Sequence, residues 1–164
     1  MPAPTRWKMS LYCSLLGWVV GCAGSPPDDD TAKGGGDGAV ADCGGPVDSV
    51  APGLVIDCES GTCAVILVDA SPETPDRGDN AWTLRATDDE GSPLPLTALA
   101  VEPFMPAHNH GTVPATHAGV EDAEGLWHVG PFDLFMPGRW EVRVALTDAQ
   151  DAEHTAVFAF CVEG

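Results

Sequence analysis

Apolar and polar residues alternate strictly in two segments of the chain. Trp82, Leu84 and Ala86 alternate with polar residues, and the segment 140–146 repeats the pattern from Trp140 to Leu146. A period of two over six or more residues is typical of a β-strand with one buried face. We therefore predict two half-buried strands, each of which begins its inward face with tryptophan.

Five further apolar runs extend this pattern. The runs at 63–69 (CAVILVD) and 156–162 (AVFAFCV) are apolar on both faces, which predicts strands at the centre of a sheet. Runs at 54–57, 96–104 and 126–135 complete a set of about seven strands. No segment of useful length shows the 3.6-residue period of an amphipathic helix.

Turn-forming residues separate these strands. The chain contains 19 glycines and 15 prolines, which interrupt it too often for long helices. Short clusters at 60–61, 89–91 and 136–138 have the composition of hairpin turns. About seven short strands with this spacing predict an all-β fold, an immunoglobulin-like antiparallel β-sandwich.

The first residues have the composition of a secretion signal. Arg6 and Lys8 precede an apolar run at 11–20. As a helix this run would span about 15 Å, which is too short to cross a bilayer. A positive start followed by a short apolar run is typical of a signal peptide, here residues 1–21.

A cysteine directly follows the signal peptide. Val20, Gly21 and Cys22 resemble the lipobox of bacterial lipoproteins, in which the cysteine becomes the lipidated N-terminus of the mature chain. The alternative is an ordinary signal peptide cleaved near Ala23. A lipid on Cys22 would attach the protein to a membrane surface. This predicts a bacterial cell-envelope protein that faces the periplasm or the cell exterior.

Residues 22–52 have the composition of a disordered tether. They include an acidic triplet at 28–30 and three glycines at 34–36, with few large apolar residues. Such a segment cannot bury enough apolar surface to fold by itself. We expect it to join the lipid to one β-sandwich domain at residues 53–164.

The net charge excludes two kinds of interaction. The chain has 7 Lys and Arg against 25 Asp and Glu, a formal net charge of -18. Nucleic-acid binding requires a basic face that neutralises phosphates, so we expect no nucleic-acid partner. Docking on anionic lipid through a basic patch is excluded for the same reason.

Four cysteines follow the predicted lipidation site: Cys43, Cys58, Cys63 and Cys161. Outside the cytoplasm an even number predicts disulfides, and four cysteines allow three pairings. If residues 60–61 form a two-residue turn, Cys58 lies opposite Cys63, close enough for a bridge. Cys43 would then tie the tether to the last strand through Cys161. A zinc site is the weaker alternative, because no second cysteine pair has matching spacing.

The tripeptide Phe-Met-Pro occurs twice, at 104–106 and 135–137. A proline restricts the preceding methionine to extended backbone and ends the strand, so both methionines are expected near loops. His108 and His110 closely follow the first copy. If this segment is extended, the two imidazoles point to the same side, roughly 6.5–7 Å apart along the chain.

Thioether and imidazole groups form a soft to borderline set of metal ligands. Calcium and magnesium bind thioethers poorly and zinc gains little from them, so copper, especially Cu(I), is the best match. We predict a copper site formed by Met105, His108 and His110, which Met136 closes if the two Phe-Met-Pro turns meet. An iron site of two histidines and one carboxylate would need a carboxylate from the flanking residues.

Several motifs of the folded part resemble the YtkA-like domain family, which is related in outline to FixH. The resemblance covers nearly all of residues 54–164 and rests on the segments 78–82 (GDNAW), 103–111 (PFMPAHNHG), 134–141 (LFMPGRWE) and 160–164 (FCVEG). It implies a small secreted or membrane-anchored β-sandwich that handles copper or heavy metals in the periplasm or at the cell surface. By position, it carries the metal role onto Met105, His108, His110 and Met136.

The leading hypothesis is a lipid-anchored protein that binds and transfers copper and is not an enzyme. The chain contains no nucleophile elbow, P-loop or dinucleotide fingerprint. The first alternative is a structural or interaction module that binds another envelope protein and uses the Phe-Met-Pro turns only for packing. The second is an accessory subunit of a metal-efflux or oxidase-assembly complex. His117, His128 and His154 are expected at the surface, outside the site.

Overall fold

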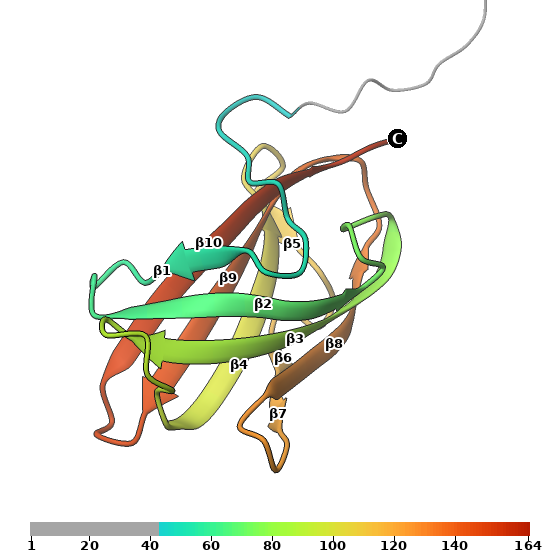
Figure 1. Cartoon of the computed structure of the whole chain (residues 1–164). Helices are drawn as coiled ribbons and strands as arrows, with labels where there is room; N and C mark the ends of the chain where they lie inside the picture. The colour runs from blue at the N-terminus through green and yellow to red at the C-terminus, as the bar shows by residue number, and fades with distance from the viewer. Residues whose placement is uncertain (1–42) are drawn as a thin grey trace, which may run out of the picture. The chain divides into compact units, whose positions relative to one another are not determined.

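The computed structural model describes residues 43–164, and within them the fold is all-β, with two antiparallel sheets (Figure 1). Sheet A contains, in spatial order, β1 (Val55–Asp57), β2 (Cys63–Ser71), β3 (Gly78–Asp88), β8 (Trp127–Leu134) and β7 (Val120–Glu121). Sheet B contains β10 (Glu153–Val162), β9 (Gly138–Asp148), β4 (Leu96–Met105) and β5 (His110–Gly111), and β6 (His117–Ala118) also pairs with β4. The predicted signal peptide and the lipid site at Cys22 lie outside the described residues.

The strand order confirms the immunoglobulin-like prediction. Without β1, β5 and β6, and with the two-residue strand β7 kept, sheet A has the order β2-β3-β8-β7 and sheet B the order β4-β9-β10. In chain order these are strands A-B-E-D facing C-F-G, the arrangement of immunoglobulin constant domains. All seven predicted segments are strands. The additional strands β5, β6 and β7 have two residues each, too few to show a periodic pattern.

The core lies between the inner faces of the two sheets. The Trp82 ring on β3 lies with its centroid 5.5 Å from that of Phe132, 5.3 Å from Phe158 and 5.9 Å from Phe160. Phe158 and Phe160 belong to β10 of sheet B, so these contacts join the layers. The predicted inward faces are confirmed, because all their residues are buried: Trp82, Leu84, Ala86, Trp140, Val142, Val144 and Leu146.

The strand β10 lies at an edge of sheet B, whereas its sequence predicted a central strand. The chain that precedes β2 covers this edge. The Asp48 N–H donates to the carbonyl of Ala159, whose own N–H donates to the Asp48 carboxylate at 2.9 Å. Further along, the Glu59 N–H donates to the carbonyl of Thr155 at 2.8 Å. Because this cover replaces a neighbouring strand, β10 carries apolar residues on both faces without exposing a free edge.

The folded part includes residues 43–52, which their composition assigned to the tether. Val50 is only 4% exposed and belongs to the core. Cys43 forms a disulfide with Cys161, with their Cα atoms 5.5 Å apart, and Arg139 Nε donates to the carbonyl of Pro46 at 3.3 Å. A segment rich in glycine and proline buries little surface of its own. Its contacts with β9 and β10 order it here, and composition does not record such contacts.

The turns agree only in part with their prediction as hairpins. Residues 60–61 lie in the hairpin between β1 and β2, and across it Cys58 and Cys63 form the second disulfide, with Cα atoms 5.2 Å apart. This pairing removes the zinc alternative. The turn at 136–138 is not a hairpin, because it joins β8 of sheet A to β9 of sheet B. Residues 89–91 close one isolated bridge before the chain crosses to sheet B.

The packing of residues 43–52 can be tested at Val50. We expect Val50→Ala to lower the free energy of unfolding by about 1–3 kcal/mol, because it removes buried methyl groups and leaves a small cavity. The matched control is Val47→Ala, which changes a half-exposed residue of the same segment and should have an effect within about 0.5 kcal/mol. Denaturant titrations of both variants compare the two. Equal, negligible effects would contradict the packing.

Candidate metal-binding site

The first Phe-Met-Pro motif ends in a tight hairpin between β4 and β5. Met105, the last residue of β4, pairs with His110, the first residue of β5. The His108 N–H donates to the carbonyl of Met105 at 3.2 Å, and the Asn109 N–H donates to that of Pro106 at 3.4 Å. Asn109 has a φ of 52°, a left-handed conformation that asparagine tolerates better than most residues.

The predicted extended conformation around the two histidines is therefore wrong, but their side chains are close together. The ring centroids of His108 and His110 are 5.6 Å apart, with an angle of 44° between the ring planes. The two rings come together because the chain reverses at Asn109. The alternation of side chains along a strand is not the cause. His108 is exposed and His110 is half-buried. Thus one imidazole faces solvent and the other is directed into the end of the sandwich.

Gly111 allows β5 to approach β4 closely. A Cβ atom at this position would clash with the carbonyl oxygen of Pro103. The same carbonyl accepts a hydrogen bond from the Thr112 N–H at 3.4 Å. A side chain at Gly111 would therefore push β5 away from β4, and it would move His110 away from Met105.

Met105 lies at a strand end, as predicted, but it is buried. It is 1% exposed and belongs to the hydrophobic core. Directly opposed residues in an antiparallel pair place their Cβ atoms about 4.5–5.5 Å apart on the same face of the sheet. The side chains of Met105 and His110 therefore share the inner face of sheet B. A metal bound by Met105 would have to lie at this inner face and not on the outside of the loop.

His110 carries an unpartnered polar atom. Its Nδ1 is buried without a hydrogen-bond partner, a property that only Trp82 Nε1 shares among the described side-chain nitrogens and oxygens. The Phe135 ring stacks on the imidazole, with centroids 5.4 Å apart and 19° between the planes. An unsatisfied buried polar group costs about 1–3 kcal/mol, and an aromatic pair contributes about 0.5–1.5 kcal/mol. The cost is the larger of the two, so stacking on Phe135 offsets only part of it.

The second Phe-Met-Pro motif lies in the turn between β8 and β9. Met136 is half-buried and packs against the core, and its carbonyl accepts a hydrogen bond from Trp140 Nε1 at 2.9 Å. Phe135 makes an edge contact with Trp140 at 5.8 Å between centroids. Since Phe135 also stacks on His110, the two motifs meet at one end of the sandwich, the upper end in Figure 1. The predicted site residues thus come from two neighbouring turns.

The donors gathered at this end are neutral. Within residues 43–164, no three His, Cys, Asp or Glu side chains come together in a way that would hold a metal ion. The candidate set therefore consists of two imidazoles with thioethers near them. Such a set suits a soft cation and lacks the carboxylate that an iron site of two histidines and one carboxylate requires.

The other three histidines have hydrogen-bond partners. His117 Nε2 lies 3.0 Å from Thr112 Oγ1. His128 Nε2 lies 2.9 Å from an Asp122 carboxylate oxygen, and its Nδ1 lies 3.1 Å from Thr83 Oγ1. His128 is exposed, as expected, whereas His117 was expected at the surface and is half-buried.

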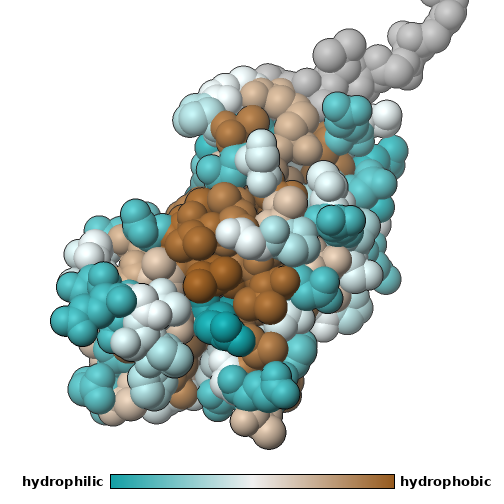
Figure 2. All heavy atoms as spheres, viewed as in Figure 1, coloured by the Kyte–Doolittle hydropathy of each residue, from teal (hydrophilic) through white to brown (hydrophobic). Residues whose placement is uncertain are grey.

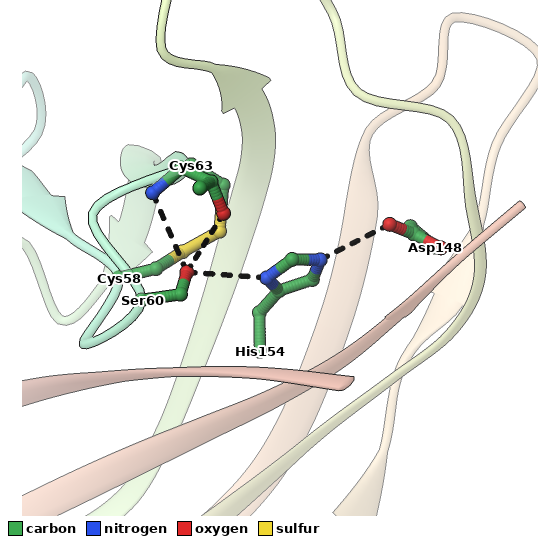
Figure 3. The surroundings of a disulfide bond; sticks show 6 residues. Cys58, Ser60, Cys63, Asp148 and His154 are labelled. Carbon is green, nitrogen blue, oxygen red and sulfur yellow. Dashed lines mark hydrogen bonds and ion pairs between the residues drawn. A yellow bond between two sulfur atoms is a disulfide. The ribbon is translucent and has the colours of Figure 1, made fainter. Parts of the chain in front are cut away.

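His154 is buried, although its sequence context predicted an exposed residue. Its side chain is 11% exposed and lies between β10 and the turn that carries the Cys58–Cys63 disulfide (Figure 3). Nε2 lies 3.1 Å from an Asp148 carboxylate oxygen, and Nδ1 lies 3.3 Å from Ser60 Oγ. His154 therefore links the hairpin between β9 and β10 to the turn after β1.

Asp148 and Asp122 close their turns in the same way. Asp148 Oδ1 accepts the N–H of Gln150 at 2.8 Å and that of Ala152 at 2.9 Å. Asp122 Oδ1 likewise accepts two N–H groups of its own turn, at 2.9 and 3.0 Å. In both cases the other carboxylate oxygen bonds a histidine six residues later. In two hairpins, therefore, an aspartate closes the turn and bonds the histidine six residues later. The alternation of apolar and polar residues does not reveal this spacing.

The set Ser60, His154 and Asp148 has the residue types of a catalytic triad, but its contacts indicate a structural role. The same arrangement of aspartate, histidine and hydroxyl recurs in a different hairpin, with Thr83 in place of serine. The N–H groups beside the serine are already used, because that of Gly61 donates to the carbonyl of Cys58 and that of Thr62 to Ser60 Oγ.

The chain was compared with protein-family models, curated proteins and solved structures, and none of them matches it. The described part of the chain also has no helix that is long and apolar enough to cross a membrane. The resemblance to the YtkA-like family therefore stays a prediction from the motifs.

Acid should weaken the two aspartate-closed turns. The hydrogen bond from His154 and then that from the Ala152 N–H hold the pKa of Asp148 below its ordinary value of 3.8, and His128 and then the Leu126 N–H do the same for Asp122. A carboxyl whose pKa is lowered by folding stabilises the fold above its unfolded pKa. This contribution is lost as the pH falls through the folded pKa.

We therefore expect the free energy of unfolding to fall below about pH 5, and the fall to be shallower in Asp148→Asn and Asp122→Asn. Urea titrations from pH 7 down to pH 3 measure the slope. Glu163→Gln, at an exposed position near the C-terminus, is the control and should keep the slope of the unaltered protein. Equal slopes in all four proteins would contradict the role of the two aspartates.

Substitution of Gly111 should open the hairpin that holds His110. We expect Gly111→Ala to destabilise the pairing of β5 with β4, because the added Cβ meets a backbone carbonyl that cannot move out of the strand. Amide hydrogen exchange at Thr112 should then accelerate, since its bond to Pro103 weakens. Ala107→Ser, an exposed change in the same loop, is the control. Unchanged exchange in Gly111→Ala would show that β5 has more room than the structure indicates.

Proposed function

We propose that this protein binds copper, as Cu(I), at the end of the sandwich where the two Phe-Met-Pro turns meet. One observation carries the proposal: His110 has a buried Nδ1 without a partner, on the same sheet face as the buried thioether of Met105. The His108 ring lies 5.6 Å from that of His110, at the exposed side of the hairpin. A soft cation would satisfy the free nitrogen and use the thioether.

The donor chemistry supports copper over other metals. Thioether and neutral imidazole favour Cu(I), whereas calcium and magnesium require several oxygen ligands. Met136 would complete the set from the second turn, next to Phe135, which already contacts His110. Because the ligands are neutral and one of them is exposed, the site suits uptake and release of the ion, and the role is metal handling or delivery.

In this proposal, the cellular location is inferred from the sequence. A lipid on Cys22 would hold the domain at a membrane in the bacterial cell envelope, and the resemblance of the motifs to YtkA-like domains supports the same setting. Two disulfides within the described residues suit an oxidising compartment. A protein partner in the envelope, such as a metal-efflux or oxidase-assembly complex, would receive the ion.

Competition for Cu(I) tests the proposal directly. The full chain carries Cys13→Ser and Cys22→Ser, so that its only cysteines are those of the two disulfides, and it is titrated under anaerobic conditions against a chromogenic Cu(I) chelator. We expect one equivalent of copper to leave the chelator, and the double variant His108→Ala/His110→Ala to lose this competition. The control is His128→Ala, whose imidazole is bonded to Asp122 and Thr83 and should not affect copper binding. Failure of the unaltered chain to compete would refute the copper proposal.

Substitution by leucine tests the metal-binding role of each methionine separately from its packing role. Met105→Leu and Met136→Leu nearly conserve side-chain volume, so each should lower the free energy of unfolding by less than about 1.5 kcal/mol. If the thioethers bind copper, each variant nevertheless weakens Cu(I) binding about tenfold or more, which costs about 1.4 kcal/mol of binding free energy. Full affinity in Met105→Leu would show that this residue only packs the core.

An exposed apolar surface favours the alternative function, a protein-interaction module. Figure 2 shows apolar residues gathered on the outer face of sheet A. Val55 is 51% exposed and pairs with Ile66, which is half-buried. Both residues line a shallow hollow of about 450 Å³, together with Asp57 and Asp88. If copper does not bind, this face is where Val55→Asp should abolish binding to a partner protein while the fold is kept.

A further inference from the structure

We infer that Phe135 is a gate that controls how fast the ion enters the site at His110. The inference rests on the proposed copper function and adds the regulation of that site. It begins from the conflict at His110, where the ring is stacked on Phe135 while its Nδ1 is buried without a partner. The stacked arrangement is the closed state of the site.

The contacts of Phe135 leave its side chain free to move while its backbone is held. Phe135 is 41% exposed, so part of its ring has no protein neighbour. Its carbonyl accepts a hydrogen bond from Arg77 Nη2 at 3.4 Å, and the next carbonyl, that of Met136, accepts one from Trp140 Nε1 at 2.9 Å. The turn is therefore anchored on both sides, and movement of Phe135 requires only rotation of its side chain.

The geometry of metal binding explains why the stacking acts as a gate. An imidazole nitrogen binds a metal in the plane of its ring, through a lone pair that points away from the ring. Phe135 lies nearly parallel to the His110 ring and prevents it from turning about its bond to the backbone. Because Nδ1 is buried, an ion from solvent reaches its in-plane lone pair only after the imidazole turns, and this turn breaks the stack.

A second consequence links the two turns. Met136 directly follows Phe135, and its side chain packs against the core in the closed state. A change of state at Phe135 would therefore occur directly beside the proposed thioether ligand of the second turn.

The stack is present only in the metal-free protein, so it opposes uptake of the ion. Without the stack, no aromatic pair has to break before the ion binds. We expect Phe135→Leu to accelerate uptake of Cu(I) from a chelator about two- to tenfold, which corresponds to the strength of one aromatic pair. The dissociation constant should fall by about the same factor, while the rate of release stays nearly unchanged. Phe135→Tyr keeps the ring and should keep the original rate.

Stopped-flow transfer of Cu(I) from a chromogenic chelator to the metal-free full chain measures these rates. Val120→Ala, at an exposed apolar residue of β7, is the matched control and should leave them unchanged. Copper binding with the same transfer rate in Phe135→Leu as in the unaltered chain would overturn the gate and leave the copper function standing. Absence of copper binding by the unaltered chain would overturn both, so the two failures are distinguishable.

A measurement on the unaltered protein does not depend on how the variants fold. In the metal-free protein, proton NMR should show short-range contacts between the rings of His110 and Phe135, as their stacking requires. Loading with Ag(I), a diamagnetic substitute for Cu(I), should remove these contacts and shift the Nδ1 resonance of His110. Ring contacts that persist in the loaded protein would contradict the gate.

Discussion

The aromatic packing around Trp82 is the interaction on which the rest of the structure depends. Trp82 lies on sheet A and contacts Phe158 and Phe160 of sheet B, so its ring joins the two layers. Because side chains alternate along a strand, this contact also decides which residues of β3 face the core. On sheet B, Met105 lies at the inner face of β4 and His108 lies exposed in the loop that follows, so the candidate site has one buried and one exposed side.

At the edge of sheet B and in the hairpins, local contacts satisfy the hydrogen-bonding groups of the backbone. The segment around Asp48 pairs with the free edge of β10, and the disulfide between Cys43 and Cys161 fastens it there. At the opposite end, aspartate and histidine pairs close two hairpins with the same bonds. These pairs have the residue types of a catalytic site, yet their repetition shows that they serve the fold. In this domain, a histidine with good partners is a structural residue.

His110 is the exception to that rule, and this distinguishes the end of the sandwich with the two Phe-Met-Pro turns. Natural sequences satisfy nearly all buried polar groups, and departures cluster at functional sites. The cost of the free Nδ1 is larger than the gain from stacking on Phe135. A site with this unmet cost can change state when an ion supplies the missing partner. The proposed copper function and the proposed gate at Phe135 both derive from this single local conflict.

The sequence by itself determined the strands, the fold class and the inward faces, because alternation of side chains and burial are coupled directly. It also predicted the pairing of Cys58 with Cys63 from the length of one turn. Tertiary structure alone decided that β10 lies at an edge, that the segment 43–52 belongs to the domain and that 136–138 joins two sheets. It likewise decided that Phe135 stacks on His110. These features depend on contacts between residues that are far apart in the sequence. A local pattern predicts which side chains are buried, but it does not predict which distant residue packs against them.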